Sequence, residues 1–340
     1  MIRDEVKKIY HNDKGHIYTT GSEGYWSNLD KNENQELIAS LDHMTVKESI
    51  RQFQPWLSEI IFSPKRAAGL ELLNLSGNES CIDYGCMWGA LAIALAKRCR
   101  YVLGVDQTMD SLRLLNARIR EDGIENMDLL CGDLKEIKIF DNKFDIAVVN
   151  GVLEWIPEKG RIELKKYYGK HDSKEYSIEP GQQQLLFLQK VNKNLNEKGK
   201  LYLAIENRYD FKMFLGVNDP HANIPFASFL PRKAADILSE RFLGRPYVNW
   251  LYSFKGIEAL LKQAGFSKVE LYMCFPDYRF PERIMSYSSS LKGFRTTISL
   301  RNTKGEVTLK RNLAAAAEYI VFKILKAKFF APSIISIAYK

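Results

Sequence analysis

The stretch IDYGCMWGAL, residues 82–91, decides the fold class of this 340-residue chain. It begins as a short apolar strand, turns at Gly85 and continues into the helical run ALAIALAKRC, residues 90–99. A strand that ends in a glycine turn and opens a helix presents backbone N–H groups and the positive end of the helix dipole to a ligand above it. The stretch therefore predicts a cofactor loop in an α/β protein, although Met87 stands where another glycine is expected.

Short apolar segments alternate with longer helical ones after this loop, as in a parallel sheet covered by helices. Further helices are predicted at 109–122, 183–195 and 254–266. Strands are predicted at 80–85, 101–106 and 127–133, at the start of 144–156, and at 201–208, 268–275 and 332–340. The pattern divides the chain into an N-terminal helical cap (1–75), a core (76–275), and a basic insertion with a final strand that completes the sheet (276–340). The polar segment 157–180 is long enough for a mobile lid.

Composition and charge limit the class of protein. The formal charge of +8 is concentrated in residues 291–330, which carry a net +7 and would attract phosphates or an anionic membrane surface. A solvated helix face is the simpler alternative. The five cysteines form no C-x-x-C pair, which indicates reduced, buried thiols and no metal site. The charged N-terminus and the lack of an 18-residue apolar run favour a cytoplasmic protein.

Several ordered motifs resemble those of the class I S-adenosylmethionine-dependent methyltransferases over roughly residues 78–275. The loop reads D-x-G-x-x-x-G and differs from the family's D-x-G-C-G-x-G at Met87. The other matching segments are an acid at Asp106, then CGDL (131–134), FDIAVVNGVLEWI (144–156) and LNEKGKLYLAIENR (195–208). The resemblance implies a Rossmann-like, seven-stranded, mostly parallel sheet with an antiparallel last strand, an N-terminal helical cap and a C-terminal insertion.

The same resemblance implies S-adenosylmethionine as the cofactor. It places Asp106 on the ribose hydroxyls and Asp133 near the adenine amino group. A carboxylate at Asp83, beneath the loop, suits the ammonium and sulfonium end of the cofactor and would repel a pyrophosphate. The full set of expected cofactor-binding residues is Asp83, Gly85, Cys86, Gly89, Asp106, Gln107, Asp133, Leu134 and Asn150.

The acceptor is expected above the carboxyl ends of the fourth and fifth strands. This crevice rule points to Asn150, Glu154, Glu206, Asn207 and Arg208, and to the insertion that follows them. Within that insertion His221 is the most base-like group. We therefore expect a catalytic group of His221 as general base, Asp219 as its orienting partner, and Glu206. The alternative makes Asp219 the start of a turn and His221 an exposed loop residue.

The segments IENRYDFKMFLG, DPH, FASFLPR and FPDYRFP resemble a methyltransferase subgroup associated with surface-glycan biosynthesis. That resemblance implies O-methylation of a sugar or glycan hydroxyl, lipid- or phosphate-linked, and no nucleic-acid partner. The basic region and the amphipathic run AEYIVFKILKAKFF (317–330) fit peripheral contact with the inner membrane face. We expect instead that Ile320, Ile324 and Phe329 dock on the sheet.

Other functions remain open from the sequence. An NAD-dependent oxidoreductase acting on a nucleotide sugar would share the acid at Asp106, but the middle glycine of its loop is missing. A non-catalytic methyltransferase-fold scaffold would explain Met87. Amino-group methylation of nucleic acid would need an N-P-P-Y or D-P-P-Y tetrad, where this chain has NGVL. If Met87 keeps a negative φ, its side chain costs little and the loop remains functional.

Overall fold

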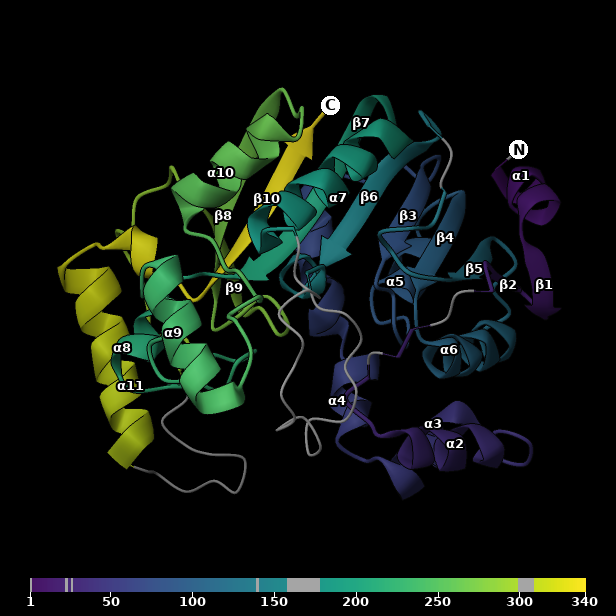
Figure 1. The fold of residues 1–340 in the computed structure, drawn as a ribbon, viewed down its shortest axis with the longest axis horizontal. Helices are drawn as coiled ribbons and strands as arrows, with labels where there is room; N and C mark the ends of the chain where they lie inside the picture. Colours follow the sequence, from purple (N-terminus) through teal and green to yellow (C-terminus); the bar gives the residue numbers. More distant parts are fainter. Residues whose placement is uncertain (1, 22–23, 26, 139–140, 158–177, 299–308) are drawn as a thin grey trace.

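A mixed sheet of ten strands forms the centre of the described part of the chain (Figure 1). The computed structural model describes residues 2–21, 24–25, 27–138, 141–157, 178–298 and 309–340. The predicted lid at 157–180 lies almost wholly outside them.

The strand order is β1-β2-β5-β4-β3-β6-β7-β10-β8-β9. The strands are β1 (His11–Lys14), β2 (Ile17–Thr19), β3 (Ser80–Tyr84), β4 (Tyr101–Asp106), β5 (Met127–Cys131), β6 (Phe144–Asn150), β7 (Leu195–Glu206), β8 (Lys268–Phe275), β9 (Arg283–Ser286) and β10 (Ser333–Tyr339).

Helices cover both faces of this sheet. The side chains of α7 (Pro180–Asn194) and α10 (Phe254–Gln263) enter the core on one face. Those of α5 (Ala92–Ala96), α6 (Met109–Glu121) and η1 (Pro64–Leu73) enter the core on the other. The remaining helical elements are α1 (Ile2–Ile9), α2 (Lys31–Ser40), α3 (Val46–Phe53), α4 (Leu57–Phe62), η2 (Leu153–Trp155), α8 (Phe211–Phe214), α9 (Arg232–Leu243), α11 (Leu309–Tyr319), η4 (Ile320–Ile324) and η5 (Lys328–Phe330).

The prediction of seven strands is wrong in number. The hairpin β1–β2 extends one edge, where β2 pairs in parallel with β5, and β9 extends the other edge beside β8. The expected helical cap at 1–75 therefore contributes strands as well as helices. β10 runs antiparallel to both of its neighbours, β7 and β8. The hairpin was missed because its strands, HNDK and IYT, are too short and polar to give an alternating apolar pattern.

The rest of the N-terminal segment packs over the glycine loop. α2 begins with a capping box between Asp30 and Glu33, and α3 with one between Thr45 and Glu48. Their apolar faces form one buried cluster with Trp88 of the loop and with two residues of α6. Met87 packs against its edge; the fully buried members are Leu29, Leu37, Val46, Ile50, Leu57, Ile61, Trp88, Leu114 and Ala117.

The amphipathic run near the C-terminus does not dock as expected. Ile320, Ile324 and Phe329 are 47%, 59% and 47% exposed. Phe322 is the residue that enters the core, where its ring contacts those of Phe211, Phe275 and Phe294. The run forms a π-helical turn in η4, and this wider turn accompanies the change in which side chains face inward.

Two further sequence predictions concern membranes and thiols. No helix in the described ranges is long and apolar enough to cross a membrane. All five cysteines lie within these ranges; they are buried and none forms a disulfide.

The buried position of Phe322 leads to a test of how this run packs. Phe322→Ala should lower the free energy of unfolding by about 3–5 kcal/mol, because it leaves a cavity among three aromatic rings. The matched change Phe329→Ala, at a half-exposed position, should cost much less. Chemical denaturation of both variants measures the difference, and equal losses would contradict this packing.

Candidate functional site

The glycine loop is held against the end of β4 by backbone hydrogen bonds. The N–H groups of Gly85 and Cys86 both donate to the Val105 carbonyl oxygen, at 2.7 and 3.1 Å. The Met87 N–H donates to Oδ2 of Asp106 at 2.9 Å. The Thr108 N–H donates to the other oxygen of the same carboxylate, also at 2.9 Å. A single aspartate therefore fixes both the loop and the start of α6.

Met87 does not keep a negative φ, which was the condition under which its side chain would cost little. Its φ is +43°, in the left-handed region where a side chain is strained. Glycine adopts this conformation without that strain. Gly89, with φ +78°, is more demanding, because a Cβ there would lie 2.2 Å from Leu115 Cδ1 of α6. Gly89 is thus required by backbone conformation and by close packing of the loop on the helix.

A pocket of about 570 Å³ opens at the carboxyl ends of β3, β4, β5 and β6. Six of the predicted cofactor residues line it: Gly85, Asp106, Gln107, Asp133, Leu134 and Asn150. The sequence analysis did not assign several other lining residues to the cofactor: Met87, Lys135, Gly151, Val152, Trp155 and Ile156.

A second recess lies beneath the loop and shares Gly85, Met87 and Asn150 with the first. Asp83 and Cys86 line this recess, together with Arg66 from η1. Gly89 lines neither cavity. Asn150 Oδ1 is buried and has no hydrogen-bond partner among the described residues. An unsatisfied buried acceptor is costly, so a ligand that donates a hydrogen bond there would be favoured.

The two acids of the loop region have raised pKa values. Burial, reinforced by the nearby Asp106 carboxylate, raises the pKa of Asp83 to about 8, and Arg66 opposes the shift. Burial also raises the pKa of Asp106 to about 6, against the hydrogen bonds from Thr108 and Met87. A bound cation would favour the ionised form of both groups. Asp133, in the same pocket, accepts the Lys135 N–H at 2.8 Å.

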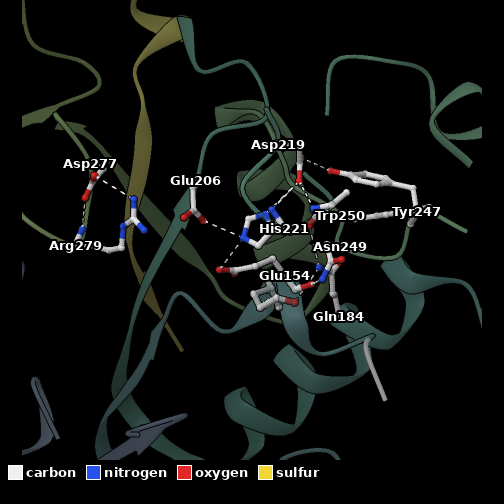
Figure 2. Close-up of polar contacts among 12 residues, drawn as sticks. Glu154, Gln184, Glu206, Asp219, His221, Tyr247, Asn249, Trp250, Asp277 and Arg279 are labelled. Atoms are coloured by element: carbon white, nitrogen blue, oxygen red, sulfur yellow. Dashed lines mark hydrogen bonds and ion pairs between the residues drawn. The ribbon is translucent and has the colours of Figure 1, made fainter. Parts of the chain in front are cut away.

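The three predicted catalytic residues lie together with Glu154 (Figure 2). His221 Nε2 is 3.7 Å from Glu154 Oε1 and 3.6 Å from Glu206 Oε2. His221 Nδ1 is 3.7 Å from Asp219 Oδ1. The His221 side chain is only 3% exposed, so the alternative of an exposed loop histidine is wrong. Asp219 also forms the expected turn, because its Oδ1 accepts the N–H groups of His221 and Ala222.

Residues from two further segments, α7 and the loop before α10, hold this group in place (Figure 2). Gln184 of α7 donates to the Leu153 carbonyl oxygen at 2.9 Å, and Asn249 donates to that of Glu154 at 3.1 Å. The Tyr247 hydroxyl donates to Asp219 Oδ2 at 2.8 Å. These supports were missed because they lie 28 to 95 residues from their partners and carry no motif.

Asn207 and Arg208, also expected near the acceptor, are structural. The Asn207 amide donates to the carbonyl oxygens of Phe329 and Ala331, both at 2.7 Å. Arg208 Nε donates to that of Ser228 at 2.6 Å. Both side chains therefore brace the insertions around the site.

The electrostatics of His221 differ from those of a general base. Burial alone would lower its pKa, but Asp219, Glu154 and Glu206 together raise the pKa of His221 to about 10. Burial raises the pKa of Glu154. The imidazole thus holds its proton at neutral pH and has no lone pair for the proton of an acceptor. The arrangement stabilises a positive charge among three carboxylates.

Comparisons with known proteins identify part of the chain. Residues 81–168 match the family model for a methyltransferase domain. A Methanococcus maripaludis protein named "Probable cobalt-precorrin-6B C(15)-methyltransferase (decarboxylating)" is 31% identical over 99 residues, covering 28% of this chain and 55% of that protein. An uncharacterized methyltransferase of Schizosaccharomyces pombe is 27% identical over 136 residues, which is 39% of this chain and 41% of the relative. The chain spans about half the length of the curated relatives it matches.

Some solved structures of methyltransferases are similar to this chain, at low sequence identity. Phosphoethanolamine N-methyltransferase 2 of Haemonchus contortus, in complex with S-adenosylmethionine, is 15% identical with a TM-score of 0.46. The match covers 89% of this chain and 60% of that one. A methyltransferase of Archaeoglobus fulgidus is 11% identical with a TM-score of 0.43, covering 85% of this chain and all of that one. The match to the methyltransferase-domain model covers residues 81–168, about a quarter of the chain.

The raised pKa of Asp83 makes stability depend on pH. An ordinary Asp has a pKa near 4, so folding takes up a proton between about pH 4 and pH 8. The free energy of unfolding should therefore fall as pH rises through this interval. Asp83→Asn removes the ionisation and should reduce this fall, leaving the variant more stable than the unmodified protein at pH 8. Urea denaturation at several pH values checks this, with the exposed-site change Asp122→Asn as control. Parallel curves for Asp83→Asn and the unmodified protein would contradict the burial argument.

Proposed function

We propose that the whole chain is an S-adenosylmethionine-dependent methyltransferase whose cofactor occupies the pocket at the ends of β3 to β6. One observation carries the proposal: the Asp83 carboxyl and the unpartnered Asn150 Oδ1 line the same recess beneath the loop. A carboxylate and an amide oxygen together suit an ammonium group. A nucleotide pyrophosphate would meet a like, negative charge there and be repelled, which disfavours the NAD-dependent alternative.

The residues around the pocket fit the rest of the cofactor. The Asp106 carboxylate lines the pocket and is oriented by the N–H groups of Met87 and Thr108, and a carboxylate held in this way can also accept a ribose hydroxyl. Asp133 and Leu134 line the far part of the pocket, where a carboxylate beside an apolar side chain suits an adenine ring with its amino group. When bound, S-adenosylmethionine supplies an electrophilic methyl group. The protein's contribution is to align the acceptor with it and to exclude water.

A hydroxyl is the acceptor that the neighbouring side chains suit best. Trp155 lines the cofactor pocket, and its ring lies 4.9 Å from that of His221, so the acidic group adjoins the pocket. Carboxylates and a charged imidazole can orient a hydroxyl by hydrogen bonds on both sides. We infer O-methylation of a sugar or glycan-type hydroxyl, with Glu206, His221 and Asp219 on the acceptor side. The surface-glycan resemblance supports the same class of acceptor.

The C-terminal surface supports an acceptor that is lipid- or phosphate-linked. α8 and α11 pack together, and ring contacts join Phe214 to Phe330. Around them several large apolar side chains are about half exposed or more: Phe214, Leu215, Leu313, Ile320, Ile324, Leu325 and Phe329. We call this set the apolar C-terminal surface. Lys323 and Lys326 stand among its residues, which is the composition of a surface that inserts into the headgroups of an anionic membrane. We therefore propose peripheral contact with the inner face of the membrane.

Titration with S-adenosylhomocysteine tests the cofactor assignment. The folded protein should give a binding isotherm, and Asp83→Asn should weaken the affinity at least about tenfold, because a hydrogen bond to a charged group is lost.

Met87→Gly should bind at least as well, since glycine adopts φ +43° without strain. The companion change Met87→Ala keeps the strain and removes the side chain. If both changes weaken binding strongly, Met87 itself contacts the cofactor.

Absence of binding heat when S-adenosylhomocysteine is titrated into the folded protein would refute the proposal. Transfer of a labelled methyl group into an extract acceptor would exclude the scaffold alternative.

Vesicle sedimentation tests the membrane contact. The protein should bind vesicles that contain phosphatidylglycerol, and added salt should weaken the binding. The double change Ile324→Ser with Leu325→Ser should reduce it severalfold, because two exposed apolar anchors are removed. Ile9→Ser, at a comparably exposed apolar side chain on α1, serves as the control and should have no effect. Equal sedimentation of all three proteins would contradict the assignment of the apolar C-terminal surface.

A further inference from the structure

The atoms at the centre of the acceptor side have the arrangement of metal ligands. One carboxylate oxygen each from Glu154 and Glu206 and one imidazole nitrogen of His221 all lie within 4.8 Å of one another. The two His221 Nε2 to carboxylate distances, 3.7 and 3.6 Å, are too long for hydrogen bonds. They are close to the separations of about 3.0–3.6 Å expected for ligands that each lie about 2.1 Å from a shared ion.

The carboxylates of this group lack other partners. Both oxygens of Glu154 and Oε2 of Glu206 are buried without a hydrogen bond from any described residue. Glu154 is 0% exposed and Glu206 9%. Two buried carboxylates side by side repel each other, and an unpaired buried charge is strongly destabilising. A single protonated imidazole at 3.6–3.7 Å compensates two carboxylates only in part. A divalent ion at the centre would compensate both and would satisfy the unpartnered oxygens.

The surroundings of His221 match those of a metal-bound histidine. A ligating imidazole usually turns its second nitrogen toward a carboxylate, which fixes the tautomer. Here Nδ1 faces Asp219 Oδ1 at 3.7 Å, and Asp219 is anchored by the Tyr247 hydroxyl and two backbone N–H groups. Once a metal ion displaced the Nε2 proton, this contact would direct the Nε2 lone pair toward Glu154 and Glu206.

The ligands come from elements that are themselves fixed. Glu206 ends β7, opposite Ser333 of β10. Glu154 lies in η2, which Gln184 and Asn249 hold by its carbonyl oxygens. A site supported in this way is preorganised, so little conformational entropy is lost on binding an ion.

We propose that Glu154, Glu206 and His221 bind a divalent metal ion, although the sequence predicted no metal site. Two carboxylates and one imidazole suit an ion such as Mn²⁺ or Zn²⁺ better than Mg²⁺, which prefers oxygen ligands alone. Three protein ligands leave coordination positions open. Glu206 is the most exposed of the three ligands and marks the side from which the ion and an acceptor would enter.

The role of this ion rests on the proposed methyltransferase function. An acceptor hydroxyl that occupies an open position would be held beside Trp155 and thus beside the cofactor pocket. The metal lowers the pKa of a bound hydroxyl, whose proton then passes to water. His221 would act as a ligand, so no histidine base is needed. This resolves the conflict between the predicted base and the high pKa of the imidazole.

Binding of Mn²⁺ to the untagged protein, followed by loss of the free-ion electron paramagnetic resonance signal, tests the site directly. One ion should bind per chain, and Zn²⁺ should displace it. Glu154→Gln and His221→Gln should each weaken the affinity at least about tenfold. Glu282→Gln changes an exposed carboxylate paired with Lys65 and should bind Mn²⁺ as the unmodified protein does. The melting temperature with and without Mn²⁺ gives a second readout, because an ion that binds only the folded state should raise it in the unmodified protein and not in the ligand variants.

The outcomes separate the two proposals. If S-adenosylhomocysteine binds but neither Mn²⁺ nor Zn²⁺ does, the metal site is refuted and the methyltransferase proposal stands. If the ion binds and the variants abolish it while S-adenosylhomocysteine does not bind, the metal site stands without the proposed reaction. Equal Mn²⁺ binding by all variants, each verified as folded by its thermal transition, would place the ion elsewhere and overturn the assignment.

Discussion

The carboxylate of Asp106 is the constraint on which the site depends. It accepts N–H groups from the glycine loop and from the start of α6, and so joins the ends of β3 and β4 to the helix that follows. Because the loop is held in this way, Met87 can adopt a positive φ that its side chain disfavours. The strain is offset where Met87 packs against the cluster beneath α2 and α3. The cap is therefore part of the cofactor site and not only a cover for it.

The acceptor side is built on a different principle. Its charged groups come from η2, the end of β7 and the insertion after β7, and they meet only because β6 and β7 are parallel neighbours. The insertion brings Asp219 and His221 back over the strand ends. There the Tyr247 hydroxyl donates to Asp219, and Asn249 donates to the Glu154 carbonyl oxygen. An acidic group buried beside the pocket at the strand ends favours a positive charge at its centre, whether a proton or a metal ion supplies it.

Two peripheral additions extend the central sheet, one at each edge. The β1–β2 hairpin lengthens the edge next to β5, while the insertion between β8 and β10 adds β9 and carries α11. That insertion buries Phe322 and leaves a row of apolar side chains exposed beside lysines. The same segment thus anchors itself to the core with one aromatic ring and leaves other apolar side chains exposed.

Sequence by itself determined the α/β class, the central strands, the glycine loop and six of the residues that line the pocket at the strand ends. These features follow from local patterns: apolar runs of strand length, helical spacing, and an acid or glycine at a strand end. It also predicted that His221, Asp219 and Glu206 lie near the carboxyl ends of the strands, because the crevice rule needs only the order of the strands.

Only the tertiary structure showed the hairpin at the sheet edge, the sign of φ at Met87 and which side of η4 is exposed. It also showed that Glu154 lies with Glu206 and His221 in a ligand-like group. None of these has a local signal. Each depends on distances between residues far apart in the chain. Each also depends on whether a buried charged or polar group finds a hydrogen-bonding or ionic partner. Such distances are set when the layers pack, because hydrophobic patterning fixes which face of an element is buried but not which polar atoms meet across it.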